Sequence, residues 1–106
     1  MNSDQFSELS AKILSTALGI QTAKRPDYTI ESLDVLQNFK AVGERLKISP
    51  LLVGRVYALK HEDAITRMAV SPLATLSEPP LGRICDRINY ALLEAALLLE
   101  VRGSLD

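Results

Sequence analysis

Residues 77–103 read SEPPLGRICDRINYALLEAALLLEVRG and decide the fold. Ser77 is a residue type that caps helices, and two prolines follow it where the first turn tolerates them. Apolar side chains then recur at three- and four-residue spacing as far as Val101, and Gly103 is of the type that ends helices. The segment therefore predicts one long C-terminal helix.

The second half of this helix, residues 91–101 (ALLEAALLLEV), is apolar nearly all round. A helix of that kind is buried on more than one side. A small four-helix monomer has difficulty covering it, whereas a symmetric oligomer, most often a dimer, does so easily. We therefore expect a homo-oligomer with Leu92, Leu98 and Leu99 near the interface.

The preceding helix has the clearest start in the chain. Ser49 occupies a capping position, and Pro50 follows at the first helical position, where its missing N–H costs nothing. The pattern predicts a helix to about Ala69 and a loop over residues 70–77, with Pro72 as its breaker. Because this loop is short, the two helices that it joins are expected to pack antiparallel.

Two more helices are predicted in the N-terminal half. Ser3 is expected to cap the first helix, which fades near Gly19, and residues 21–28 are predicted to form a loop. Thr29 is expected to cap the second helix. The apolar positions that define the two helices are Phe6, Leu9, Ile13 and Leu14, and then Leu33, Leu36, Phe39, Val42 and Leu46.

Gly43 lies inside the second predicted helix. A glycine there costs up to about 1 kcal/mol relative to alanine. Something should compensate for this cost, most simply the close approach of another helix.

Length and composition complete the prediction of the fold. The chain has 106 residues, of which 47% are hydrophobic and 24% charged, as in ordinary globular proteins. Aromatic residues make up only 5%, so the core must be mainly aliphatic. We expect a single all-α domain over residues 1–106, with about four helices in an antiparallel bundle.

Charge and cysteine content exclude several classes of function. The net charge is −1, whereas proteins that bind polymeric nucleic acid normally carry a basic excess. Cys85 is the only cysteine, and no Cys/His cluster has zinc-site spacing. The N-terminal stretch does not resemble a signal peptide, and residues 91–101 are shorter than the roughly 20 residues that span a bilayer. We expect a cytoplasmic protein with no membrane partner.

Polar residues gather at helical spacing on the last two predicted helices. Lys60, Asp63 and Arg67 share one face of the third helix. Asp86, Asn89 and Tyr90 share a face of the fourth, with Arg83 one turn earlier. Folding the chain at the middle of the connecting loop brings Lys60 within one turn of Asp86 and Asn89, so the two sets are expected to converge.

Such a convergence predicts a pocket for a phosphate-bearing small molecule. Lys60 and Arg67 would neutralise the anion, Asn89 would recognise polar edges, and Tyr90 would stack on the ligand. Lys24 and its neighbour Arg25, in the predicted loop, would close over a phosphate.

A structural interpretation of the same residues stays open. Lys60 would then pair with Asp86, while Asp63 and Arg67 would form an ordinary surface pair. His61 has no nucleophile motif beside it and is expected to be exposed or satisfied in the core. Hydrolysis with Mg²⁺ needs several carboxylates from facing helices, and the chain has no paired-Glu repeat. We therefore assign no catalytic residue, no metal ligand and no cofactor.

Several short motifs resemble those of small phage and prophage proteins that belong, or lie close, to the "nucleotide modification associated" helical domain. That domain is distantly similar to the all-α nucleotide pyrophosphatases of the MazG and dUTPase type. The resemblance spans residues 24–100, and its most specific part is Asp86-x-x-Asn89-Tyr90 with Glu78 eight residues before the aspartate. The other matching residues are Asp27, Tyr28, Asn38, Phe39, Lys60, His61, Ala64, Ile65, Ser77, Pro79, Gly82, Arg83 and Ile84.

The resemblance implies that Asp86, Asn89 and Tyr90 mark the functional helix, with Lys60 and Glu78 as partners. Two departures argue against hydrolysis: Gly82 stands where many members carry an acid, and the E-E-x-x-E motif of MazG-type enzymes is missing. A MazG-like protein that binds a nucleotide-like anion without turnover is then implied, for instance to sequester a host nucleotide signal in a bacterial cytoplasm.

Two other functions compete with this one. A Mg²⁺-dependent nucleotide pyrophosphohydrolase would need carboxylates that sequence patterns do not identify, for instance ones supplied across a subunit interface. A protein-binding adaptor would use the apolar C-terminal helix as its docking surface.

Overall fold

A computed structural model describes residues 1–28, 34–73 and 77–106, and within these residues the chain forms four helices and no strand. The helices are α1 (Ser3–Tyr28), α2 (Gln37–Leu46), α3 (Pro50–Val70) and α4 (Pro80–Arg102). The prediction of an all-α chain with about four helices is confirmed. The cap predicted at Thr29 and the apolar position predicted at Leu33 lie outside the described residues.

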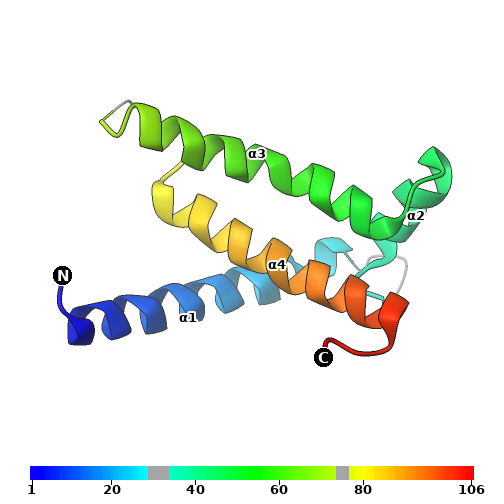
Figure 1. Ribbon diagram of the computed structural model, residues 1–106, viewed down its shortest axis with the longest axis horizontal. Coiled ribbons are helices and arrows are strands. Elements are labelled where there is room, and N and C mark those ends of the chain that lie inside the picture. Colours follow the sequence, from blue (N-terminus) through cyan, green and yellow to red (C-terminus); the bar gives the residue numbers. More distant parts are fainter. Residues whose placement is uncertain (29–33, 74–76) are drawn as a thin grey trace.

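Helix α4 lies at the centre of the arrangement. It packs against α3 on one side and against α1 on another, while the short α2 packs against α3 (Figure 1). Helices α3 and α4 run in opposite directions, as predicted from their short connection. Helix α1 runs in the same general direction as α4, so the antiparallel prediction does not extend to this pair (Figure 1).

The start of α3 and the end of α4 form as their sequences predict. The Ser49 hydroxyl accepts a hydrogen bond from the backbone N–H of Leu52 at 3.1 Å, and Pro50 begins the helix. At the other end, Gly103 has the left-handed φ of 78° and donates its N–H to the Leu99 carbonyl at 2.8 Å. Both ends therefore satisfy backbone groups that a helix terminus would otherwise leave unpaired.

The capping residues predicted for the starts of α1 and α4 are wrong. Asn2, and not Ser3, caps α1: its side chain accepts from the Gln5 N–H at 2.9 Å, and the Gln5 side chain accepts from the Asn2 N–H at 2.8 Å. Pro79, and not Ser77, precedes α4 in an extended conformation. The reason is steric, because a residue before proline is disfavoured in the helical region.

The predicted loop over residues 21–28 is also wrong, because α1 continues through Gly19 to Tyr28. Pro26 falls in the last turn, where its missing N–H takes away one helical hydrogen bond without interrupting the turns before it. Helix α2, in contrast, begins only at Gln37. Just before it, the Asp34 side chain accepts from the Leu36 N–H at 2.9 Å and holds a turn.

The core lies where α2, α3 and the second half of α4 meet. Leu36, Phe39, Val53 and Leu97 form its buried centre. A second contact joins α1 to α4, where Ala17 and Cys85 are both fully buried. Cys85 therefore packs as a small hydrophobic residue, and burial raises the pKa of its thiol.

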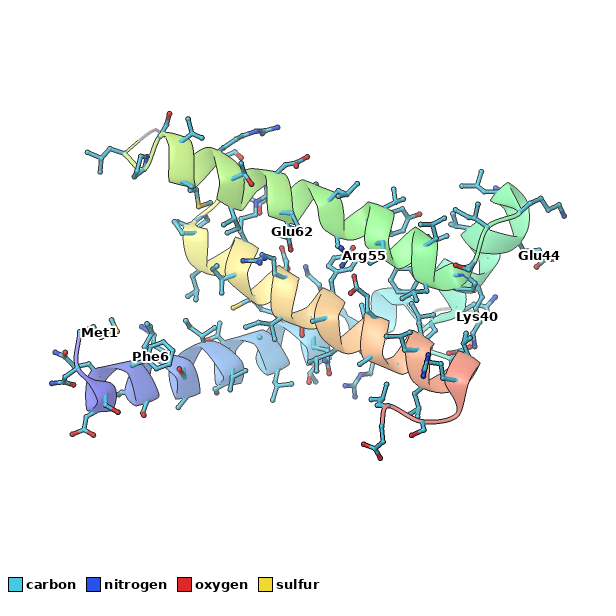
Figure 2. The ribbon with its side chains drawn as sticks, in the orientation of Figure 1. Met1, Phe6, Lys40, Glu44, Arg55 and Glu62 are labelled. Atoms are coloured by element: carbon cyan, nitrogen blue, oxygen red, sulfur yellow. The ribbon has the colours of Figure 1, made fainter. Side chains whose placement is uncertain are left out.

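Ion pairs at the surface fix the register of α3 against α4. Arg55 and Glu62 lie on α3 beside α4 (Figure 2), where they pair with Glu94 at 3.2 Å and with Arg87 at 2.9 Å. Exposed pairs of this kind each contribute up to about 1 kcal/mol. They orient the two helices more than they stabilise them.

None of the helices in the described residues has the length and apolar character needed to cross a membrane.

Gly43 is compensated by the close approach of the turn that follows α2 and of Pro50, the first residue of α3. The chain reverses at Lys47, which has a left-handed φ of 59°, and the Ile48 N–H donates to the Gly43 carbonyl at 3.0 Å. A Cβ atom at position 43 would lie 2.7 Å from the Ile48 carbonyl oxygen. Glycine is therefore required here because the backbone itself approaches so closely.

We expect alanine at positions 43 and 19 to change stability in opposite directions. Gly43→Ala should lower the free energy of unfolding by about 1–3 kcal/mol, because the new methyl group overlaps backbone that cannot move freely. Gly19→Ala is the matched control, since a Cβ there meets nothing within 4 Å; it should raise stability by about 0.5–1 kcal/mol. Urea unfolding curves measure both values, and a stabilising Gly43→Ala would contradict the close turn.

Candidate functional site

A cleft of about 560 Å³ opens between the end of α1, the middle of α3 and α4. This volume falls within the range typical of small-molecule sites. Its polar and charged lining residues are Gln21, Lys24, Arg25, Lys60, His61, Glu78, Asp86 and Asn89. Its aromatic and apolar lining residues are Tyr90, Val35, Leu92, Leu93 and Ala96.

The structure brings together five of the seven residues predicted for the pocket. These five line the cleft: Lys24, Lys60, Asp86, Asn89 and Tyr90. Arg67 and Arg83 do not line it. The expected convergence of the third and fourth helices thus takes place, with α1 as a third wall.

Lys24 reaches the cleft from a helix and not from a loop. Its ammonium group lies 3.4 Å from the Asp86 carboxylate, which is therefore paired with α1. The pair expected between Lys60 and Asp86 does not form, and Lys60 has no ion-pair partner within 4 Å in the described part of the chain. Asp63 and Arg67 are likewise not paired with each other among those residues.

His61 forms part of the floor of the cleft and is only 4% exposed. Its Nδ1 lies 3.2 Å from a guanidinium nitrogen of Arg83. Because a guanidinium only donates hydrogen bonds, this contact is a hydrogen bond in the neutral tautomer whose Nδ1 accepts. Burial lowers the pKa of His61, although the Asp86 carboxylate 3.5 Å from Nδ1 opposes the shift.

Arg83 contacts His61 but does not itself line the cleft. Besides its contact with the imidazole, its guanidinium lies 3.5 Å from the Glu78 carboxylate. Arg83, one of the residues predicted for the pocket, therefore lies against His61 and Glu78 and not in the lining of the cleft.

Asn89 joins α4 to α1. Its side-chain amide donates to the Ala17 carbonyl at 2.9 Å, and its oxygen faces the Gln21 amide at 3.5 Å. Both ends of the side chain therefore have partners in the protein. Asn89 shapes the wall of the cleft, and the free hydrogen-bonding edge expected from the sequence is already in use.

Tyr90 packs with aromatic neighbours of the protein. Its ring centre lies 5.3 Å from that of His61 and 6.5 Å from that of Phe39, the latter nearly edge to face. These distances are typical of favourable aromatic pairs. Tyr90 thus connects the wall of the cleft to the core.

The cleft is polar at one end and apolar at the other. Lys24, Lys60 and Asp86 mark the polar end, and Leu93 and Ala96 lie up to ten residues further along α4. Ten helical residues span about 15 Å. A ligand that fills the cleft would need a charged or strongly polar group at one end and an apolar or flat part at the other.

Residues 1–28, 34–73 and 77–106 hold no group of three or more His, Cys, Asp and Glu side chains arranged to bind a metal ion. Two carboxylates, Asp86 and Glu78, line the cleft. Each lies beside a cationic side chain, Lys24 and Arg83 respectively.

The sequence patterns did not predict two of the polar residues that line the cleft, Gln21 and His61. Gln21 falls in the segment predicted to be a loop, so the pattern did not indicate that it lies one helical turn before Lys24. His61 was expected to be exposed or satisfied in the core, and it is indeed buried with a hydrogen-bond partner. Its position directly after Lys60 was the signal that it lies near the cleft.

No family model, no curated protein and no solved structure matches this chain.

The buried His61 predicts that stability falls as the pH drops below about 6.5, the usual pKa of a histidine in the unfolded chain. Because the folded-state pKa is lower than the unfolded one, the unfolded chain binds more protons between the two values. His61→Gln keeps an acceptor for Arg83 and removes the titration. Its melting temperature should fall less than that of the wild type between pH 7.5 and 5.5, and equal declines would contradict the assignment.

Proposed function

We propose that this protein binds a nucleotide-like anionic small molecule in the cleft between α1, α3 and α4, without turning it over. The observation that carries the proposal is the position of Lys60. It lines the polar end of the cleft and has no ion-pair partner within 4 Å in the residues that the structure describes. A cation in this position is available to an anionic group of a ligand.

The other charges of the cleft favour a ligand of low charge. The ammonium group of Lys24 lies beside Asp86, and Glu78 lies beside Arg83, so these charges are largely balanced within the protein. The carboxylate of Asp86 accepts hydrogen bonds and suits the hydroxyl groups of a ribose. One phosphate on Lys60, with the sugar near Asp86 and the base toward Leu93, fits this order of groups.

The proposal extends to the class and the assembly of the protein. We propose a MazG-like helical protein of the phage type that works as a homo-oligomer in the cytoplasm and sequesters a nucleotide signal. Support comes from the all-helical chain, from the lining of the cleft by Asp86, Asn89 and Tyr90, and from the apolar surface described below.

Lys60→Ala tests the site directly. The probes are the four common ribonucleoside monophosphates with their di- and triphosphates, titrated by calorimetry. Removing Lys60 should weaken the tightest of them about tenfold, or about 1.4 kcal/mol, because one charge-assisted hydrogen bond to phosphate is lost. Arg67→Ala is the matched control: it removes the same charge from α3 but lies outside the cleft, so affinity should stay as in the wild type.

Three results would contradict the proposal. Equal losses in both variants would indicate general electrostatic attraction and no specific site. A wild type that binds none of the probes would exclude these nucleotides as ligands of the cleft. Release of phosphate or pyrophosphate that stops in EDTA would replace binding with Mg²⁺-dependent pyrophosphohydrolysis.

A further inference from the structure

The chain exposes more surface than a compact monomer of its size. Its accessible surface is 7700 Å², whereas a folded monomer of 11.6 kDa exposes about 5,800 Å². Its radius of gyration is 15.8 Å, compared with about 13 Å for a compact domain of this length. The excess of about 1,900 Å² is comparable to what each subunit buries in an obligate homodimer.

One face of α4 carries a continuous apolar surface that no other described helix covers completely. We call it the α4 stripe; its members are Leu81, Ile84, Ile88, Ala91, Ala95 and Leu98. They follow one another at alternating spacings of three and four residues, the heptad pattern of helices that pack side by side. None of the six is fully buried, and Leu81 and Ala91 are exposed.

The space beside the α4 stripe is open. A shallow groove of about 360 Å³ runs between α3 and α4, and Ile84, Ile88 and Ala91 line it. Figure 1 shows α4 passing in front of α1, with α3 along another side of α4. A further helix therefore has room to lie along this face.

We infer that the α4 stripe binds the α4 stripe of a second copy of this chain in an antiparallel pair. In that register Leu81 lies opposite the partner copy's Leu98, Ile84 opposite its Ala95, and Ile88 opposite its Ala91. Ile84 and Ile88 thus face alanines, which lets the helices pack closely at the centre, and leucines face each other at the two ends. The pairing is symmetric about a two-fold axis, so both copies use the same surface.

Charges at the edge of the stripe agree with the antiparallel direction. Arg87 and Glu94 flank it on the α3 side, and both line the groove. In the antiparallel register, Arg87 of one copy lies within two residues of the level of Glu94 of the other. Opposite charges therefore lie near each other at both ends of the central contact, while Arg87 and Glu94 keep their pairs with Glu62 and Arg55 inside each subunit.

The interface leaves the cleft accessible. Asp86 and Leu93 line the cleft, and they project from a different face of α4 than the stripe residues between them. The inference rests on the proposed self-association and is independent of the proposed ligand. A dimer of this kind presents one cleft on each subunit.

Charge substitution at Ala91 tests the interface. Because Ala91 is exposed in the single chain, Ala91→Glu leaves the fold of the subunit intact but places two like charges at the contact. Sedimentation velocity at micromolar concentration should give twice 11.6 kDa for the wild type and 11.6 kDa for the variant. Leu59→Glu is the matched control, since Leu59 is an exposed apolar residue of α3 that does not line the groove, and this variant should remain a dimer.

Mixing variants of opposite charge separates a broken interface from a broken fold. Ala91→Glu and Ala91→Lys should each be monomeric, and an equimolar mixture should restore the dimer. Should folding itself depend on pairing, each variant alone loses helical circular dichroism and the mixture regains it. A mixture that restores neither dimer nor helicity overturns the inference.

The remaining outcomes point to different failures. A monomeric wild type refutes self-association, and the α4 stripe would then be a surface for a different protein. A dimer that survives Ala91→Glu but dissociates with Leu59→Glu places the interface on α3, and self-association then stands while the α4 stripe fails. Nucleotide binding by a folded, monomeric Ala91→Glu should match the wild type, so the two proposals fail separately.

Discussion

The contact between α1 and α4 is the constraint on which the cleft depends. Ala17 and Cys85 are small and fully buried, so the two helices approach closely there, and Asn89 ties them with its bond to the Ala17 carbonyl. This point of contact sets where the rest of α1 runs. One to two turns further on, the same helix delivers Gln21 and Lys24 to the cleft. A wider separation of the helices would remove a wall of the site.

Sequence patterns predicted those parts of the fold that local chemistry determines. Ser49 and Pro50 start α3, and Gly103 ends α4, because a cap, a proline and a left-handed glycine act within one turn. The patterns failed for residues 21–28, where Lys24, Arg25 and Pro26 are typical of a loop. There, contacts of α1 with Asn89 and Asp86 on a distant helix support the helical conformation, and no local pattern reveals them.

The candidate site shows the same division. The spacing of Lys60 and of Asp86, Asn89 and Tyr90 predicted that they would meet, because helix periodicity and a short connection suffice for that inference. Their individual contacts were not predictable. Asp86 faces Lys24 and not Lys60, and Asn89 is engaged with α1, because both outcomes depend on the placement of a helix more than sixty residues away.

Helix α4 thus divides its faces between three tasks, and its composition follows from that division. Its polar residues Asp86 and Asn89 face α1 and the cleft, Leu97 enters the core, and the remaining apolar face carries the α4 stripe. An apolar segment covered by one neighbour would need only one hydrophobic face. Residues 91–101 are apolar nearly all round because the same turns of α4 contribute side chains to the core, to the cleft and to the α4 stripe. Two of the three alanines among them, Ala91 and Ala95, fall on the stripe, where a second helix would need room to approach, and the third, Ala96, lines the cleft.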